Sequence, residues 1–223
     1  MRLFGFFAVV AALLAPGRAE AIVVPSPASG LPPKFHGTIS RIDADLRDRM
    51  RGISWHAGCP VGLGDLRLLE VDRWGYGGKV KHGRLVVHER AARRIRGVFE
   101  RLFEIRFPIR RMRLIDDYGG SDRRSLRANN TSAFNCRFVA GTTRWSMHAF
   151  GRAIDLNPVQ NPYVAGSHVS PPAGADYLDR SRRAKGMIHA GDRVVRAFAA
   201  AGWEWGGYWT YPKDYQHFSS TGR

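Results

Sequence analysis

The sequence predicts one globular domain that contains both helices and short strands. Apolar residues recur at helical spacing over 88–104 and 194–201, whereas apolar and polar residues alternate over 152–157. The 223 residues, of which 44% are hydrophobic and 24% charged, suit one soluble domain with a sizeable core. No internal repeat is visible, so a single domain is expected to account for the folded part of the chain.

Residues 1–21 are expected to form a secretory signal and not part of that domain. A basic residue at the start, an apolar run over 3–14 and an Ala-Glu-Ala ending are typical of such signals. The run is short for a bilayer, and an uncleaved membrane anchor is the alternative. Residues 22–37, rich in Pro and Ser, are expected to form a linker. The domain then covers 38–223, and the protein is expected to be secreted or held in the cell envelope.

The chain is strongly basic, with a formal net charge of +16 that stays at about +15 without residues 1–21. Such a field attracts polyanions, which for an exported protein are anionic cell-wall polymers and phospholipid head groups. No nucleic-acid-binding module is recognisable, so no nucleic-acid partner is expected. The alternative is a solvated basic surface that only improves solubility.

The two cysteines, Cys59 and Cys136, are expected to form one disulfide. Their even number and the oxidising compartment that export implies both favour a bridge. Two separate buried thiols are the alternative. A structural zinc site is less favoured, because neither cysteine has a CxxC-type partner nearby.

The first half of the domain is expected to contain two helices. Ser40 is a suitable N-cap for a helix over 40–51, in which apolar residues recur at helical spacing. The second helix covers 88–104, with apolar residues on one face and arginines on the other. The glycine-rich sequence between these helices predicts loops with short extended pieces at 66–71 and 84–87.

The second half is expected to combine long loops with short strands and one helix. Alternating residues near 112–114 predict a strand with one exposed face, and a last strand is expected at 215–219. The helix covers 194–201. The segments 116–144 and 158–179, rich in Gly, Asn, Ser or Pro, are expected to be loops.

Two short segments of the second half carry the residue types of a catalytic metal site. His148 and Asp155 lie in one segment, separated by Gly151, and Asp214 and His217 lie near the C-terminus. Because side chains alternate along a strand, Asp155 and His217 can converge above a sheet if their strands are neighbours. Gly151 allows the chain to turn and bring His148 over the same point. Two histidines and an aspartate are a known ligand set for catalytic zinc, with the fourth position left for water.

Nearby residues suggest the remaining roles. Asp214 is the expected general base and later the acid that protonates the leaving amine, with Glu204 as the second choice. Arg137 is a candidate to stabilise a carbonyl oxygen as it becomes negative. Ser146 is expected to orient His148 or to contact substrate. As alternatives, Asp214 could simply cap the last strand, and the histidines could be packing or surface residues.

These motifs resemble a known family. The pattern Ser146-x-His148-x-x-Gly151-x-Ala153-x-Asp155, followed by Gly-Trp-x-Trp-Gly-Gly and Asp214-x-x-His217-Phe, is similar to that of the zinc D-alanyl-D-alanine metallopeptidases. That family includes D,D-carboxypeptidases, D,D-dipeptidases and L-alanyl-D-glutamate peptidases. The resemblance spans roughly residues 80–219 and is specific because both motifs occur together.

The resemblance implies a fold and a chemistry. The fold is a small α+β domain with a central antiparallel sheet, flanked by helices, that carries the zinc site. One zinc ion would be held by His148, Asp155 and His217, with Asp214 as the acid and base, and Arg137 near the substrate carbonyl. The implied substrates are peptidoglycan stem peptides, and we expect a monomer. The alternatives are a non-catalytic zinc-containing domain and a metal-free module that binds polyanions of the cell wall.

Overall fold

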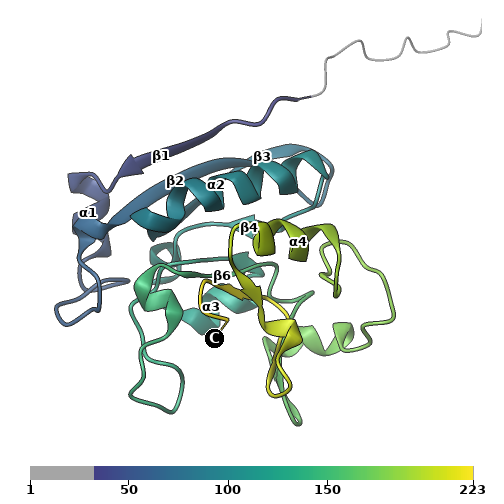
Figure 1. The fold of residues 1–223 in the computed structure, drawn as a ribbon. Coiled ribbons are helices and arrows are strands. Elements are labelled where there is room, and N and C mark those ends of the chain that lie inside the picture. Colours follow the sequence, from purple (N-terminus) through teal and green to yellow (C-terminus); the bar gives the residue numbers. More distant parts are fainter. Residues whose placement is uncertain (1–32, 223) are drawn as a thin grey trace, which may run out of the picture. The chain divides into compact units, whose positions relative to one another are not determined.

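The computed structural model describes residues 33–222 (Figure 1). The expected signal at 1–21 and most of the expected linker at 22–37 therefore lie outside the described residues. Helices and antiparallel sheets are both present, which confirms the α+β class. In residues 33–222, no helix is both long and apolar enough to cross a membrane.

The first half is built on an antiparallel sheet of three strands in the order β1-β2-β3. The strands are β1 (Gly37–Arg41), β2 (Leu66–Trp74) and β3 (Val80–His88). β2 and β3 form one hairpin in which Leu69 pairs with Leu85. The prediction of only short extended pieces at 66–71 and 84–87 was therefore wrong in length. Both faces of this sheet are packed, so the strands lack the apolar and polar alternation that marks a strand with one wet face.

The first helix is shorter than predicted. α1 covers Ala44–Met50, and its N-cap is Asp43, whose side chain accepts a hydrogen bond of 2.8 Å from the backbone of Leu46. The helix predicted at 40–51 is therefore confirmed in part, but Ser40 as its N-cap was wrong, because Ser40 lies in β1 and pairs with Leu68 of β2. Pairing between distant segments took precedence over the local capping signal.

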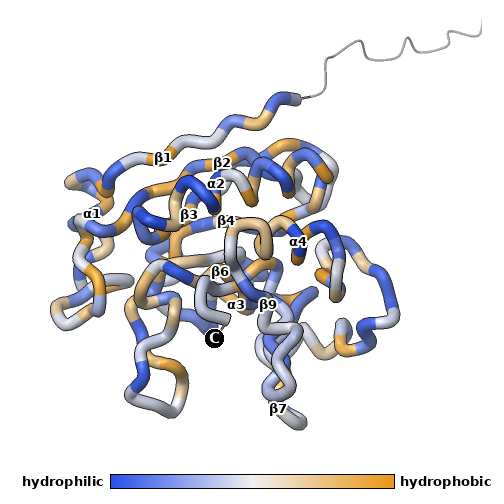
Figure 2. The backbone as a smooth tube through the Cα atoms, viewed as in Figure 1, coloured by the Kyte–Doolittle hydropathy of each residue, from blue (hydrophilic) through white to orange (hydrophobic). Residues whose placement is uncertain are grey.

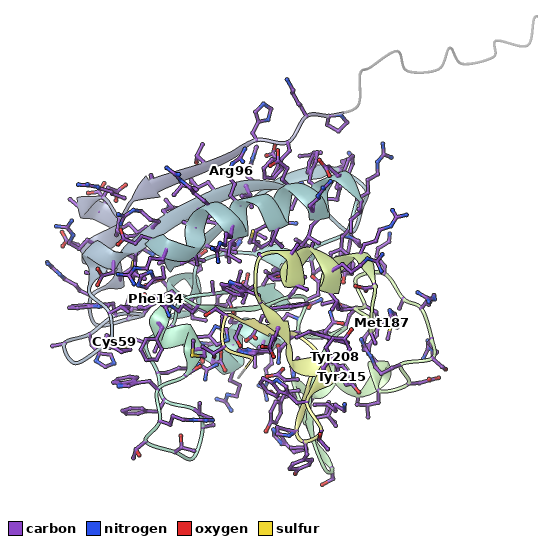
Figure 3. All side chains as sticks on the ribbon, viewed as in Figure 1. Cys59, Arg96, Phe134, Met187, Tyr208 and Tyr215 are labelled. Atoms are coloured by element: carbon purple, nitrogen blue, oxygen red, sulfur yellow. A yellow bond between two sulfur atoms is a disulfide. The ribbon has the colours of Figure 1, made fainter. Side chains whose placement is uncertain are left out.

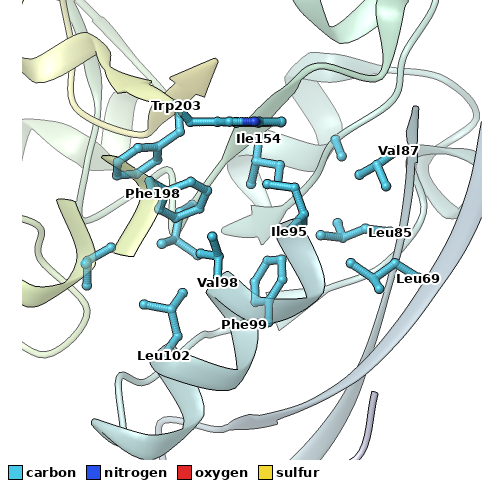
Figure 4. Packing of buried hydrophobic residues seen from close by; sticks show 14 of the residues in the cluster. Leu69, Leu85, Val87, Ile95, Val98, Phe99, Leu102, Ile154, Phe198 and Trp203 are labelled. Carbon is cyan, nitrogen blue, oxygen red and sulfur yellow. The ribbon is translucent and has the colours of Figure 1, made fainter. Parts of the chain in front are cut away.

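The helix α2 (Glu89–Glu104) confirms the prediction at 88–104. His88 is its N-cap and accepts a hydrogen bond of 3.1 Å from the backbone of Arg90. Apolar and polar residues alternate along α2 in Figure 2. Figure 1 shows α2 lying along β2 and β3, and Figure 4 shows its apolar side chains against those of the two strands. The buried side chains of this face include Ile95, Phe99 and Leu102. Burying such an amphipathic face is what stabilises a helix in a protein.

The second half contains short strands in separate small sheets, not one large central sheet. One antiparallel sheet has the order β6-β11-β9 and another the order β10-β7-β8, while β4 and β5 form a parallel pair. The bounds are β4 Arg111–Met112, β5 Asn130–Thr131, β6 Ala153–Asp155, β7 Tyr163–Ala165, β8 His168–Ser170, β9 Glu204–Trp205, β10 Lys213–Asp214 and β11 His217–Ser219.

The two predicted loops contain short regular elements. The helix α3 (Asp122–Arg127) lies in the first, and β7 and β8 form a hairpin in the second. Short 3₁₀ helices occur at Leu63–Asp65, Ile115–Tyr118, Met147–Phe150, Pro172–Tyr177 and Gly206–Tyr208. The prediction that 116–144 and 158–179 are loops is therefore correct only in part.

The helix α4 (Arg193–Ala200) agrees with the prediction at 194–201 and joins the two halves through a common core. Its Phe198 ring stacks on Phe218 of β11 with 3.9 Å between ring centroids. Ile154 of β6 lies in the same cluster as the apolar residues of α2 and the first sheet (Figure 4).

Cys59 and Cys136 form a disulfide, as predicted. The bridge lies beside a second apolar cluster on the other face of the first sheet, which includes Leu66 and Phe134 (Figure 3). It joins the irregular segment before β2 to the chain that leads into the metal-ligand motif.

Candidate metal centre

The pairing of β6 with β11 places two of the predicted ligands side by side. His217 lies opposite Asp155, and Phe218 lies opposite Ile154. Since side chains alternate along a strand, Ile154 and Phe218 point into the core while Asp155 and His217 share the other face. The predicted convergence above a sheet is therefore present.

His148 reaches the same point from a 3₁₀ turn directly before β6. The Ser146 hydroxyl caps this turn by accepting a hydrogen bond of 3.3 Å from the backbone of His148. Gly151 ends the turn with a φ of +63°, and a Cβ there would lie 2.6 Å from the backbone nitrogen of His88. Only glycine fits this turn without strain. Nδ1 of His148 lies 2.6 Å from the carbonyl oxygen of Ala133.

The contact with Ala133 decides which nitrogen of His148 is available. A carbonyl oxygen only accepts, so Nδ1 carries a proton and Nε2 keeps a lone pair in the neutral ring. Nε2 is buried, has no hydrogen-bond partner, and lies 3.3 Å from Oδ2 of Asp155. Two acceptors facing each other at this distance require a proton or a cation between them. The orphaned nitrogen therefore fits a metal ligand.

The third ligand completes the cluster. Nδ1 of His217 lies 3.1 Å from Oδ1 of Asp155, and the ligand atoms of His148, Asp155 and His217 lie within 4.8 Å of one another. All three residues are buried. Two imidazole nitrogens and one carboxylate oxygen are a donor set that Zn²⁺ accepts, so these residues fit the metal that the sequence resemblance implies.

A second group of potential ligands, His56, Cys59 and Cys136, also brings its donor atoms together. Its two sulfur atoms are bonded to each other in the disulfide. Thiolates, which bind metals, are therefore not present in this group.

The charges of the cluster favour an ionised Asp155. Burial alone would raise the pKa of Asp155, but the neighbouring His148 and His217 outweigh it and hold that pKa well below its usual value. For His148, burial is the largest single effect and lowers the pKa, but the charge of Asp155 and the neighbouring acceptor oxygens together raise it by more, so that the net pKa lies above the ordinary value. The cluster is a negative site that stabilises positive charge.

Asp214, the expected general base, lies at the edge of this cluster in β10. Its Oδ1 is buried without a hydrogen-bond partner. Burial raises the pKa of Asp214 to about 6, an effect that the charge of His217 opposes and that of Asp155 reinforces. A carboxyl group that titrates near neutral pH is able both to accept and to return a proton.

The other predicted site residues differ in their placement. Arg137 lies 3.2 Å from Asp122 in an ion pair, and its positive charge lowers the pKa of His148, so it lies near the cluster. Nε of Arg137 is buried without a partner. The second-choice base, Glu204, lies on β9 with an exposed side chain against Gly222, unlike the largely buried Asp214.

Three neighbours of the cluster were not predicted. The carbonyl of Ala133 orients His148, and no side-chain pattern could have revealed a backbone acceptor. Gln216 forms a hydrogen bond that lowers the pKa of Asp214; its position inside the Asp-x-x-His motif was a signal that could have been used. The ring of Trp209 lies 5.5 Å from that of His217, measured between centroids.

Comparison with known proteins gives one match. Residues 140–220 match the family model described as D-alanyl-D-alanine carboxypeptidase. No curated protein and no solved structure matches the chain. The matched segment contains His148, Asp155, Asp214 and His217, the cluster and its neighbouring carboxyl group. The match thus supports the resemblance of the motifs to those of the zinc D-alanyl-D-alanine metallopeptidases.

Proposed function

We propose that the protein is a secreted, zinc-dependent peptidase that hydrolyses a peptide bond in peptidoglycan stem peptides. The observation that carries this proposal is the buried group of His148, Asp155 and His217 with the carboxyl group of Asp214 beside it. The family match supports a peptidase in general. The expected signal and the disulfide support export, and the strong positive charge suits an anionic cell wall.

Each residue has a role in the proposed mechanism. A bound Zn²⁺ would supply Lewis acidity, which polarises a carbonyl group and lowers the pKa of water. His148, Asp155 and His217 would hold the ion, and the Ala133 carbonyl fixes the ring of His148 in the ligating tautomer. Asp214 takes a proton from the attacking water and passes it to the amine nitrogen as the C–N bond breaks. The Arg137 guanidinium stabilises the negative charge that develops on the carbonyl oxygen.

A non-catalytic domain that holds the metal is the competing proposal. A pure binding site has no need of a proton acceptor, so the raised pKa of Asp214 favours the enzyme. A metal-free wall-binding module would leave the buried Nε2 of His148 without any partner.

Mass spectrometry of defined muropeptides, after incubation with zinc-loaded protein, tests the proposal. Release of free D-alanine identifies a carboxypeptidase, and a cut between L-alanine and D-glutamate identifies the endopeptidase type. The Asp214→Ala variant should retain stoichiometric zinc and lose turnover. Zinc binding without turnover in the unsubstituted protein would favour the non-catalytic domain, and absence of zinc would exclude both zinc proposals.

A further inference from the structure

A groove of about 420 Å³ lies between α2 and α4, and its charged lining is mostly arginine. Four exposed arginines line it, Arg94 and Arg101 from α2 and Arg193 and Arg196 from α4, together with one exposed carboxylate, Glu104. The floor consists of small or apolar residues, among them Gly97, Val98, Ala197 and Ala201. We call this feature the arginine groove.

Most of its positive charge has no counterpart in the protein. Arg101 pairs with Glu104 at 2.9 Å. Within residues 33–222, the guanidinium groups of Arg94, Arg193 and Arg196 have no carboxylate at ion-pair distance. Arg196 instead donates to the carbonyl of Gly191. Like charges around one groove repel one another, and a bound anion would relieve that repulsion.

The arginine groove lies on one side of the β6-β11 pair, and the metal cluster, by which we mean the candidate ligands His148, Asp155 and His217, lies on the other. α2 and α4 pack against the face that carries Ile154 and Phe218 (Figure 4). Asp155 and His217 alternate with these residues and project from the other face. A molecule in the groove therefore leaves access to the metal cluster open.

We propose that the arginine groove binds a linear phosphodiester polymer of the cell wall and so holds the peptidase on its substrate. The planar guanidinium group donates two parallel hydrogen bonds to a phosphate, and the small floor residues leave room for a chain to lie along the groove. The proposal rests on the part of the proposed function that brings the protein to the cell wall.

A lipid surface fits this groove less well. Proteins that dock on membranes through helices insert large apolar side chains between the lipid head groups. The exposed large apolar side chains of the described residues belong to neither α2 nor α4; they are Ile53, Phe138, Leu178, Tyr208 and Tyr211. The groove offers charge and space, but no apolar anchor.

Fluorescence anisotropy of labelled synthetic poly(glycerol phosphate), titrated with the zinc-loaded full chain, tests the proposal. We expect Arg94→Gln combined with Arg193→Gln to weaken binding by roughly 10-fold or more and to make the salt dependence of binding shallower, because two phosphate contacts are lost. The matched control is Arg41→Gln combined with Arg47→Gln, which removes the same charge from exposed positions on β1 and α1. The control should change affinity by less than about 2-fold.

Three outcomes would overturn the proposal. Equal weakening by both double variants would show that net charge alone attracts the polymer. Failure of the unsubstituted protein to bind the polymer would show that the groove is not a polymer site. Binding to phosphatidylglycerol vesicles that depends on Arg94 and Arg193, together with polymer binding that does not, would show that the groove docks on lipid instead. As a second comparison, Arg94→Lys combined with Arg193→Lys keeps the charge and loses the planar guanidinium group. This variant should bind the polymer with intermediate affinity.

Turnover of a soluble muropeptide separates this proposal from the peptidase function. Arg94→Gln combined with Arg193→Gln should retain zinc and full turnover, because neither side chain contacts the metal cluster. A protein that binds the polymer through the arginine groove, but cleaves no muropeptide, would refute the peptidase function and leave the groove assignment intact.

Discussion

Replacement of Asp214 by asparagine is expected to stabilise the metal-free protein while it removes catalysis. The pKa of Asp214 is raised by burial from an ordinary value of 3.8 to about 6. This difference means that ionising Asp214 costs about 3 kcal/mol more in the folded state than in the unfolded state. Asp214 keeps some solvent contact, which screens part of the effect, so we expect a gain of about 1–3 kcal/mol from the neutral amide.

The sign of the effect depends on pH. Below the unfolded pKa the carboxyl group is neutral in both states, so wild type and variant should have similar stability. As pH rises from 3.8 to about 6, the carboxyl group ionises in the unfolded state while it stays largely protonated in the folded state, which favours unfolding of the wild type. The advantage of asparagine should therefore grow over this interval and reach its full size above about 6. For a domain of this size the gain corresponds to a Tm increase of roughly 3–10 °C.

Denaturation of zinc-free protein at pH 7.5 and at pH 3.5 measures this difference, with exposed Asp176→Asn as the matched control. In parallel, kcat of the zinc-loaded Asp214→Asn variant should fall by about 10²–10⁴-fold with zinc content unchanged. Wild-type kcat should decline as falling pH protonates Asp214. The midpoint should lie at about 6 or below, because a bound cation would lower the pKa of Asp214 from that value. A variant that keeps full turnover, or that gains no stability at pH 7.5, would refute this assignment of Asp214.

Four further predictions follow from the fold and the cluster. His148→Ala or His217→Ala should lose stoichiometric zinc and activity together, as measured by elemental analysis and turnover. The control His56→Ala, outside the cluster, should keep both. Full zinc content and full rate in either ligand variant would contradict the ligand set. Phe218→Ala should lower the free energy of unfolding by about 3–5 kcal/mol in urea titrations, since it leaves a cavity against Phe198; a loss below about 1 kcal/mol would contradict the packing. Reduction of the disulfide, which spans 77 residues, should cost about 4.5 kcal/mol by the loop-closure relation, and an unchanged Tm under reducing conditions would argue against its structural role. Gly151→Ala should weaken zinc binding in a competition assay with a chelator, because the strained turn displaces His148; retained affinity would show that the turn adapts.

The convergence of the candidate metal ligands was predictable because much of its geometry follows from local rules. Strand alternation alone placed Asp155 and His217 on one face once their strands were neighbours, and the pairing in the structure agrees. The amphipathic helix α2 was equally clear, since one apolar face recurs through four turns. Such signals reside within a single element.

The remaining errors involve contacts between distant segments. Ser40 has the side chain of an N-cap, but its backbone pairs with β2, a partner that no local pattern names. The full length of β2 and β3 was missed because two apolar clusters cover both faces of the sheet. α3 was missed because its six residues include three arginines and only one buried apolar residue, Leu126, so it has no apolar periodicity.

The shared core has a consequence for how this protein can be divided or recombined. The segment at 140–220 contains the candidate metal ligands, yet the inner faces of β6 and β11 rest on side chains from α2 and the β2-β3 hairpin. Cutting the chain before residue 140 would leave Ile154 and Phe218 in water and remove the backbone acceptor at Ala133. Transfer of this segment to another protein would therefore have to include α2 and the β2-β3 hairpin, its packing partners.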